Sequence, residues 1–69
     1  MPKGWHVTYT DGDGKTQYAK VGIADQTSAI EAATKGRAAD GVAVLPFKDG
    51  EFEALNMTEG EVIHSASIN

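Results

Sequence analysis

The acidic, glycine-rich run Asp11-Gly-Asp-Gly-Lys comes nearer to a metal-binding loop than any other part of the sequence. A calcium loop of the EF-hand type needs oxygen ligands at its positions 1, 3 and 5, a glycine at position 6 and a glutamate at position 12. Counted from Asp11, position 3 is Asp13, but position 5 is Lys15, position 6 is Thr16 and position 12 is Gly22. The lysine would bring a positive charge among the ligands. We therefore predict a hairpin turn here, with ion binding by the loop of residues 11–15 as the alternative.

His6 and His64 are the two histidines of the chain. A zinc site needs at least three protein ligands. The chain has no cysteine, so only carboxylates could complete such a site. The two histidines would meet only if the first and last strands paired, which the sequence does not decide. We interpret each as a polar strand residue, and keep a metal or small-ligand site built on both as the alternative.

The sequence shows no constellation for nucleophilic catalysis, which needs a hydroxyl or thiol beside a base that a third group orients. Ser65 and Ser67 flank His64, but neighbours along a strand point to opposite faces. Nucleophile-elbow, phosphate-loop and dinucleotide-loop motifs are absent. Four glutamates are interpreted as a solvated acidic rim: Glu51, Glu53, Glu59 and Glu61. We expect a protein that is not an enzyme and holds no cofactor or metal.

Length and composition favour one small domain, residues 1–69, with a thin core. Leu, Ile, Val and Phe together number 13 of 69 residues, and no disulfide can support the fold. Chains of this size bury only about 60% of their unfolded surface. Association with a second copy is a natural way to bury more.

The charge and hydropathy patterns argue against two classes of partner. The net charge is −4, and residues 49–69 carry five acidic and no basic side chains. Nucleic-acid binding requires a basic face, so we expect no nucleic-acid partner. No apolar run approaches the roughly 20 residues that span a bilayer, and the first residues lack the apolar region of a signal peptide. We expect no membrane partner and a cytoplasmic location.

Residues 25–41 are the only segment with helical character, and they predict one helix. Asp25, Thr27 or Ser28 can cap its start, and Ser28 stands three residues before Glu31, as in a capping box. Gly41 is a plausible stop, while Gly36 is a weak point where the helix ends or bends. A stripe of small side chains, Ala29, Ala33 and Gly36, predicts close packing on a sheet, with a ligand or partner groove as the alternative.

The remaining segments predict strands. Residues 4–10 and 16–23 alternate between apolar and polar side chains on either side of the Asp-Gly turn, which indicates a hairpin. The continuous apolar run 42–47 is typical of a strand buried on both faces or central in the sheet, although Pro46 makes it irregular or places it at an edge there. Residues 51–55 predict a less regular strand, and residues 61–68 a last one. The expected order is β-β-α-β-β, followed by a fifth strand.

These observations predict an α+β fold: a small, mostly antiparallel sheet of four or five strands with one helix on one face. Trp5 is interpreted as core, with an interface position as the alternative. The expected function is a non-enzymatic interaction or accessory module with an unknown protein partner, self-associating as a homodimer. The C-terminal strand is the expected contact because it lacks lysine and proline, the usual protection of an edge strand. The possible interface comprises Trp5, Val62, His64, Ala66 and Ile68.

Overall fold

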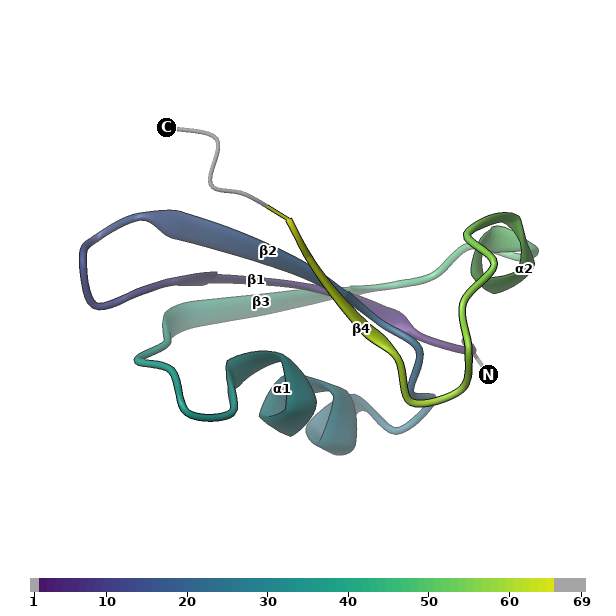
Figure 1. Ribbon diagram of the computed structural model, residues 1–69, viewed down its shortest axis with the longest axis horizontal. Coiled ribbons are helices and arrows are strands. Elements are labelled where there is room, and N and C mark those ends of the chain that lie inside the picture. Colours follow the sequence, from purple (N-terminus) through teal and green to yellow (C-terminus); the bar gives the residue numbers. More distant parts are fainter. Residues whose placement is uncertain (1, 66–69) are drawn as a thin grey trace.

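The computed structural model describes residues 2–65 as a four-stranded antiparallel sheet with one helix packed on one face (Figure 1). The strands are β1 (Trp5–Thr10), β2 (Thr16–Val21), β3 (Asp40–Pro46) and β4 (Val62–Ser65), and the helices are α1 (Gln26–Thr34) and the short α2 (Glu51–Ala54). The strand order β3-β1-β2-β4 makes the first two strands central. The predicted α+β class is confirmed, with α2 added to the predicted order.

The β1–β2 hairpin forms at the predicted turn. Its register sets Thr10 opposite Thr16 and Trp5 opposite Val21. The carboxylate of Asp11 accepts hydrogen bonds from the backbone amides of Asp13 at 2.9 Å and Lys15 at 3.0 Å. Gly14 has φ +78, a conformation that glycine adopts without steric cost. The local sequence therefore determines both the turn and the strand register.

The core lies between the sheet and α1, on the face towards which alternate residues of β1 and β2 point. Val7 and Ala19 are fully buried there, and Ala29 and Ala33 of the helix cover them. Alanine side chains allow a helix to approach a sheet closely. The predicted burial of Ala29 and Ala33 is confirmed, so this face of the helix is closed by packing on β1, β2 and β4.

Helix α1 is shorter than predicted. Its N-cap is Asp25, whose carboxylate accepts from both the amide and the hydroxyl of Ser28, at 2.9 and 2.8 Å. It ends after Thr34, because Gly36 adopts φ +71 and turns the chain. The prediction of a weak point at Gly36 is confirmed, whereas the helical extension to Gly41 is wrong. Gly36 is exposed and does not belong to the packed stripe.

Strand β3 contradicts the expectation that the apolar run 42–47 is buried on both faces or central in the sheet. Among the described strands it pairs antiparallel with β1 alone and forms one edge of the sheet. Leu45 is 68% exposed and Val42 39%. An irregularity in the β1–β3 pairing lies between Ala43 and Asp40, where Gly41 has φ +60. The edge position allowed by Pro46 is confirmed.

The strand predicted over residues 51–55 is wrong, because this segment forms α2 and its C-cap. Two reciprocal hydrogen bonds start the helix: the Glu51 amide donates to the Lys48 carbonyl at 3.0 Å, and the Lys48 amide donates to the Glu51 carboxylate at 2.9 Å. Asn56, with φ 54, turns the chain at the other end. The short alternation of Phe52 and Ala54 was too weak a strand signal to outweigh this local capping.

The C-terminal strand β4 pairs antiparallel with β2 and forms the second edge. Its described part, Val62–Ser65, agrees with the strand predicted over residues 61–68. The predicted interface residues Ala66 and Ile68, and the expectation of a strand to residue 68, lie outside the described residues.

Gly4 and Tyr9 show two consequences of the close packing around this sheet, one steric and one in hydrogen bonding. A side chain at Gly4 would collide with the carbonyl oxygen of Val21 and the ring of Phe47, so only glycine fits there. Tyr9 is 1% exposed, and its hydroxyl has no hydrogen-bond partner among the described residues. The core is thus small and leaves one polar group uncompensated within the described part of the chain.

Replacing Ala33 with Leu should lower the free energy of unfolding by about 1–3 kcal/mol, because extra methylenes cannot enter a closely packed helix–sheet contact without displacing it. Chemical denaturation measures the change. Glu31→Leu is the matched control, since Glu31 is exposed on the same helix. Equal effects of the two substitutions would contradict the packing described for Ala33.

Candidate functional site

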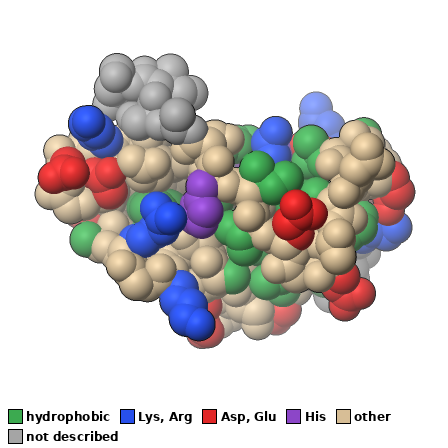
Figure 2. Space-filling view, in the orientation of Figure 1, with side chains coloured by type: hydrophobic (Ala, Val, Ile, Leu, Met, Phe, Trp, Pro, Cys, Tyr) green, Lys and Arg blue, Asp and Glu red, His purple; other side chains and the backbone are tan. Residues whose placement is uncertain are grey.

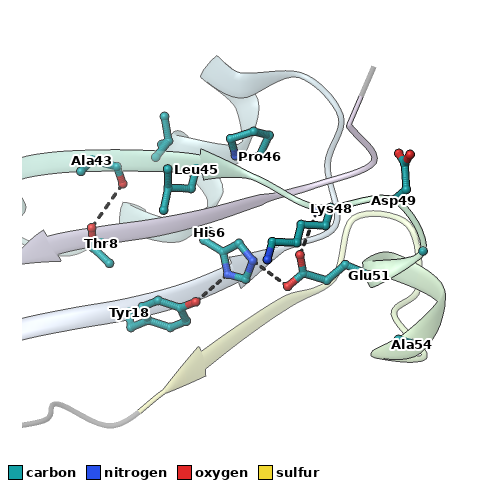
Figure 3. A pocket seen from close by; sticks show the side chains of 12 residues that line it. His6, Thr8, Tyr18, Ala43, Leu45, Pro46, Lys48, Asp49, Glu51 and Ala54 are labelled. Carbon is teal, nitrogen blue, oxygen red and sulfur yellow. Dashed lines mark hydrogen bonds and ion pairs between the residues drawn. The ribbon is translucent and has the colours of Figure 1, made fainter.

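The face of the sheet opposite α1 carries an open groove of about 860 Å³ (Figure 3). Its floor consists of β1, β2 and β3 residues that point away from the core, and α2 with the loop before it forms one wall. The residues along the groove are His6, Thr8, Tyr18, Ala43, Val44, Leu45, Pro46, Lys48, Asp49, Gly50, Glu51 and Ala54. Among them, Val44 packs its side chain against the core on the other face. Leu45 and Ala43 are exposed and apolar, whereas the polar groups gather around His6.

Three side chains from three elements form a hydrogen-bonded relay in this groove. The Tyr18 hydroxyl lies 2.5 Å from Nδ1 of His6, and Nε2 of His6 lies 2.7 Å from the Glu51 carboxylate (Figure 3). With a neutral imidazole, Nε2–H donates to Glu51 and Nδ1 accepts from Tyr18. The ring of His6 also packs edge-on against Phe47, at 4.9 Å between centroids. The relay therefore connects β1, β2 and the start of α2.

The electrostatics of the relay stabilise one set of protonation states. The Lys48 amide lowers the pKa of Glu51 below its ordinary value, and the proximity of His6 contributes in the same direction. Burial raises the pKa of Tyr18, and the negative charge of Glu51 raises it further. Tyr18 thus remains a hydrogen-bond donor and Glu51 an acceptor at neutral pH.

A carboxylate, an imidazole and a hydroxyl in series have the connectivity of a nucleophilic triad, with tyrosine in the place of serine. Here, however, burial and the negative charge of Glu51 raise the pKa of Tyr18, which opposes the ionisation of its hydroxyl. The arrangement is better suited to holding α2 against the sheet. It orients both nitrogens of His6 and stabilises the groove wall.

The Asp11 carboxylate is already engaged within its turn. Besides the two amides, its second oxygen accepts from the Gln17 side chain at 2.7 Å. These contacts, led by the Lys15 amide, lower the pKa of Asp11. These hydrogen bonds explain why an aspartate stands at this position, and the explanation does not require a bound ion.

The structure does not bring the two histidines together. His6 lies opposite Lys20 of β2, whereas His64 lies opposite Ala19, whose side chain is in the core. Neighbouring positions of β2 point to opposite faces, so the histidines do so as well. The hypothesis of a shared site on His6 and His64 is wrong for this reason. Within residues 2–65, no group of three or more metal-ligating side chains could hold an ion.

The described members of the predicted interface lie on the core side of the sheet. Trp5 packs against the core, and its indole N–H donates to the Ala24 carbonyl at 2.9 Å. Val62 also packs there. His64 is exposed overall, but partial desolvation of its ring and the positive charge of Arg37 lower its pKa. Trp5 thus has the core role that its alternating strand suggested.

The relay was not predicted from the sequence, although the sequence indicates part of it. Once the Asp-Gly turn sets the hairpin register, His6 and Tyr18 fall on the same face in adjacent strands. Their proximity could have been inferred from the alternation alone. The contact of Glu51 with His6 could not be inferred from the sequence, because residues 51–55 predict a strand. Only the tertiary structure brings α2 to His6. Glu53, also assigned to the rim, pairs instead with Lys3.

Comparison with protein families, curated proteins and solved structures finds no match. Neither helix in the described part of the chain has the length and apolar character to cross a membrane. On the face drawn in Figure 2, acidic and basic side chains are interspersed, and hydrophobic side chains gather towards the end that carries α2. The candidate site therefore has to be interpreted from its own geometry.

Glu51→Gln should destabilise the protein at neutral pH, and the difference from the wild type should shrink on acidification. Because folding lowers the pKa of Glu51 below 4.5, its stabilising contribution is present above that value and is lost as the pH falls through the folded pKa. Urea unfolding midpoints between about pH 7 and about pH 3 measure this difference. The exposed Glu59→Gln is the control. A difference for Glu51→Gln that stays constant across this range would contradict the relay.

Calcium should leave the hairpin turn unchanged, because internal donors already occupy the Asp11 carboxylate. The measurement is a calcium titration that follows the amide resonances of residues 11–22. Saturable shifts confined to this loop at micromolar calcium would instead establish an ion site.

Proposed function

We propose that this protein is a small non-enzymatic interaction module that acts by contacting another polypeptide, and that it associates with a second copy of itself. One observation carries the proposal: the most apolar run of the chain forms an edge strand on which Val42 and Leu45 are exposed, although Val44 packs against the core and Phe47 is buried. A domain with so few large aliphatic residues gains stability when such a surface is covered.

The composition of β3 supports this interpretation. Between Gly41 and Pro46 the strand has no charged side chain, and most of its residues are exposed. Soluble proteins usually protect edge strands with lysine, bulges or covering segments, because unpaired backbone groups can pair with another chain. In β3 only Pro46 and the irregularity near Gly41 act in this way.

The groove beside β3 supports an interaction surface better than a catalytic centre. Leu45 and Ala43 continue the apolar surface of the edge onto the uncovered face. The polar relay at the far side of the groove is internally hydrogen-bonded, and the raised pKa of Tyr18 favours the protonated hydroxyl. We propose a rigid wall as its role.

A small-ligand binder is the second candidate. The observation in its favour is the groove, in which oriented polar groups of His6, Tyr18 and Glu51 meet apolar side chains, as in many ligand sites. Ion binding at the Asp11 turn or between the two histidines is not supported by the geometry. Thermal melting in the presence of candidate ligands distinguishes this alternative, since a bound ligand raises the melting temperature.

Sedimentation equilibrium over a range of micromolar concentrations should show a mass that rises from 7.3 kDa towards twice that value. Leu45→Lys should shift the protein to the monomer without loss of folding, because Leu45 is 68% exposed. Thr16→Lys is the control, since it places the same side chain at an exposed position of β2, away from the β3 edge. A mass of 7.3 kDa at every concentration would refute self-association.

A further inference from the structure

The free edge of β3 presents the backbone groups of alternate residues. The Phe47 amide donates to the Gly4 carbonyl at 3.0 Å, so these two residues form a hydrogen-bonded pair. Because such pairs alternate along an antiparallel ladder, Leu45 also directs its backbone groups towards β1. Val44 and Pro46 direct theirs away from β1. The edge therefore offers the N–H and C=O of Val44 and the C=O of Pro46.

This alternation restricts how a second copy of β3 can pair with the edge. In an antiparallel pair the outward-directed residues of both strands must lie opposite one another. When Val44 lies opposite its own counterpart, each Val44 amide donates to the other Val44 carbonyl. Pro46 then lies opposite Val42 of the second copy, so its missing N–H falls at the end of the paired segment.

Charge selects this register from the permitted ones. With Val44 on the two-fold axis, Asp40 at the start of β3 in one copy comes close to Lys48, which lies two residues past the end of β3 in the other, and the contact occurs twice by symmetry. The irregularity at Gly41 displaces Asp40 by one position along the strand, so the two side chains are diagonal neighbours. Both side chains are exposed, and neither takes part in an ion pair within the described range 2–65. Residues 41–47 between them carry no charge, so no like charges meet. A shift to the next permitted register separates Asp40 from Lys48.

We propose that a second copy of this chain docks on the β3 edge, antiparallel and with Val44 at the two-fold axis, to form one continuous eight-stranded sheet. The inference rests on the proposed self-association and names its surface and register. The symmetry axis is perpendicular to the sheet, so both α1 helices lie on one face. The two grooves meet on the other face, where Leu45 of each copy lies beside Ala43 of the other.

The opposite edge is less suited to this contact. Its described strand, β4, has four residues against seven in β3. Glu59 and Glu61 stand just before it, and two copies would bring these carboxylates together. The earlier expectation of a contact through the C-terminal strand remains a prediction, and the experiment below separates the two edges.

The test is a charge swap followed by sedimentation equilibrium. Asp40→Lys and Lys48→Asp should each weaken the dimer about tenfold, because each puts two like-charged pairs into the interface. The double variant should restore the wild-type dissociation constant to within about threefold. Asp13→Lys and Lys15→Asp reproduce the same charge changes in the hairpin turn and should leave dimerisation unchanged.

A single cysteine provides an independent readout, since the chain contains none. Hydrogen-bonded antiparallel partners have Cα atoms about 5.5 Å apart, which lies within the range that a disulfide spans. Val44→Cys should therefore form a covalent dimer on mild oxidation much faster than Thr16→Cys.

The outcomes distinguish the inference from the function on which it rests. A monomer at every concentration would overturn both. A dimer that neither charge reversal weakens, or that the double variant fails to restore, would overturn the β3 register and leave self-association standing. The same holds for a dimer in which Val44→Cys links no faster than the control. Restoration by the swap together with rapid linkage at residue 44 supports the proposed contact.

Discussion

The contact of Ala29 and Ala33 with the inner face of β1 and β2 is the interaction on which the rest of the structure depends. It joins a helix of nine residues to a four-stranded sheet, and a helix of that length covers only one face. The small side chains allow a close approach, so little apolar volume is needed to close the core. Such a small core suits a chain with few large aliphatic residues, and within residues 2–65 the second face of the sheet has no covering layer.

The uncovered face is organised by polar contacts in place of a second core. The Tyr18–His6–Glu51 relay connects the two central strands to α2, and Phe47 packs against the imidazole. These interactions make one side of the groove polar and rigid. The other side, along β3, is apolar and open. The asymmetry follows from the path of the described chain, in which α2 and its loop lie beside His6 and leave Leu45 of β3 exposed.

The exposed edge and the thin core are two consequences of the same shortage of apolar side chains. Burying Val42 and Leu45 as well would require another layer to pack against, and residues 2–65 do not supply one. At the edge, apolar side chains of the run are exposed to solvent. The strand also presents unpaired backbone groups and an uncharged surface. Association of two copies would compensate for the exposure without lengthening the chain, which is the physical basis for the proposed interaction role.

The sequence by itself determined those features that neighbouring residues control. Asp11 and its glycines specified the hairpin and its register, the alternation in β1 and β2 specified which side chains face the core, and Gly36 marked the helix end. Tertiary structure alone decided the rest. The edge position of β3 depends on which strand β1 accepts as its second neighbour, and a continuous apolar run is compatible with both edge and centre. Residues 51–55 became helical through capping at Glu51 and contact with His6, a residue 45 positions away along the chain, and no local pattern encodes that distance.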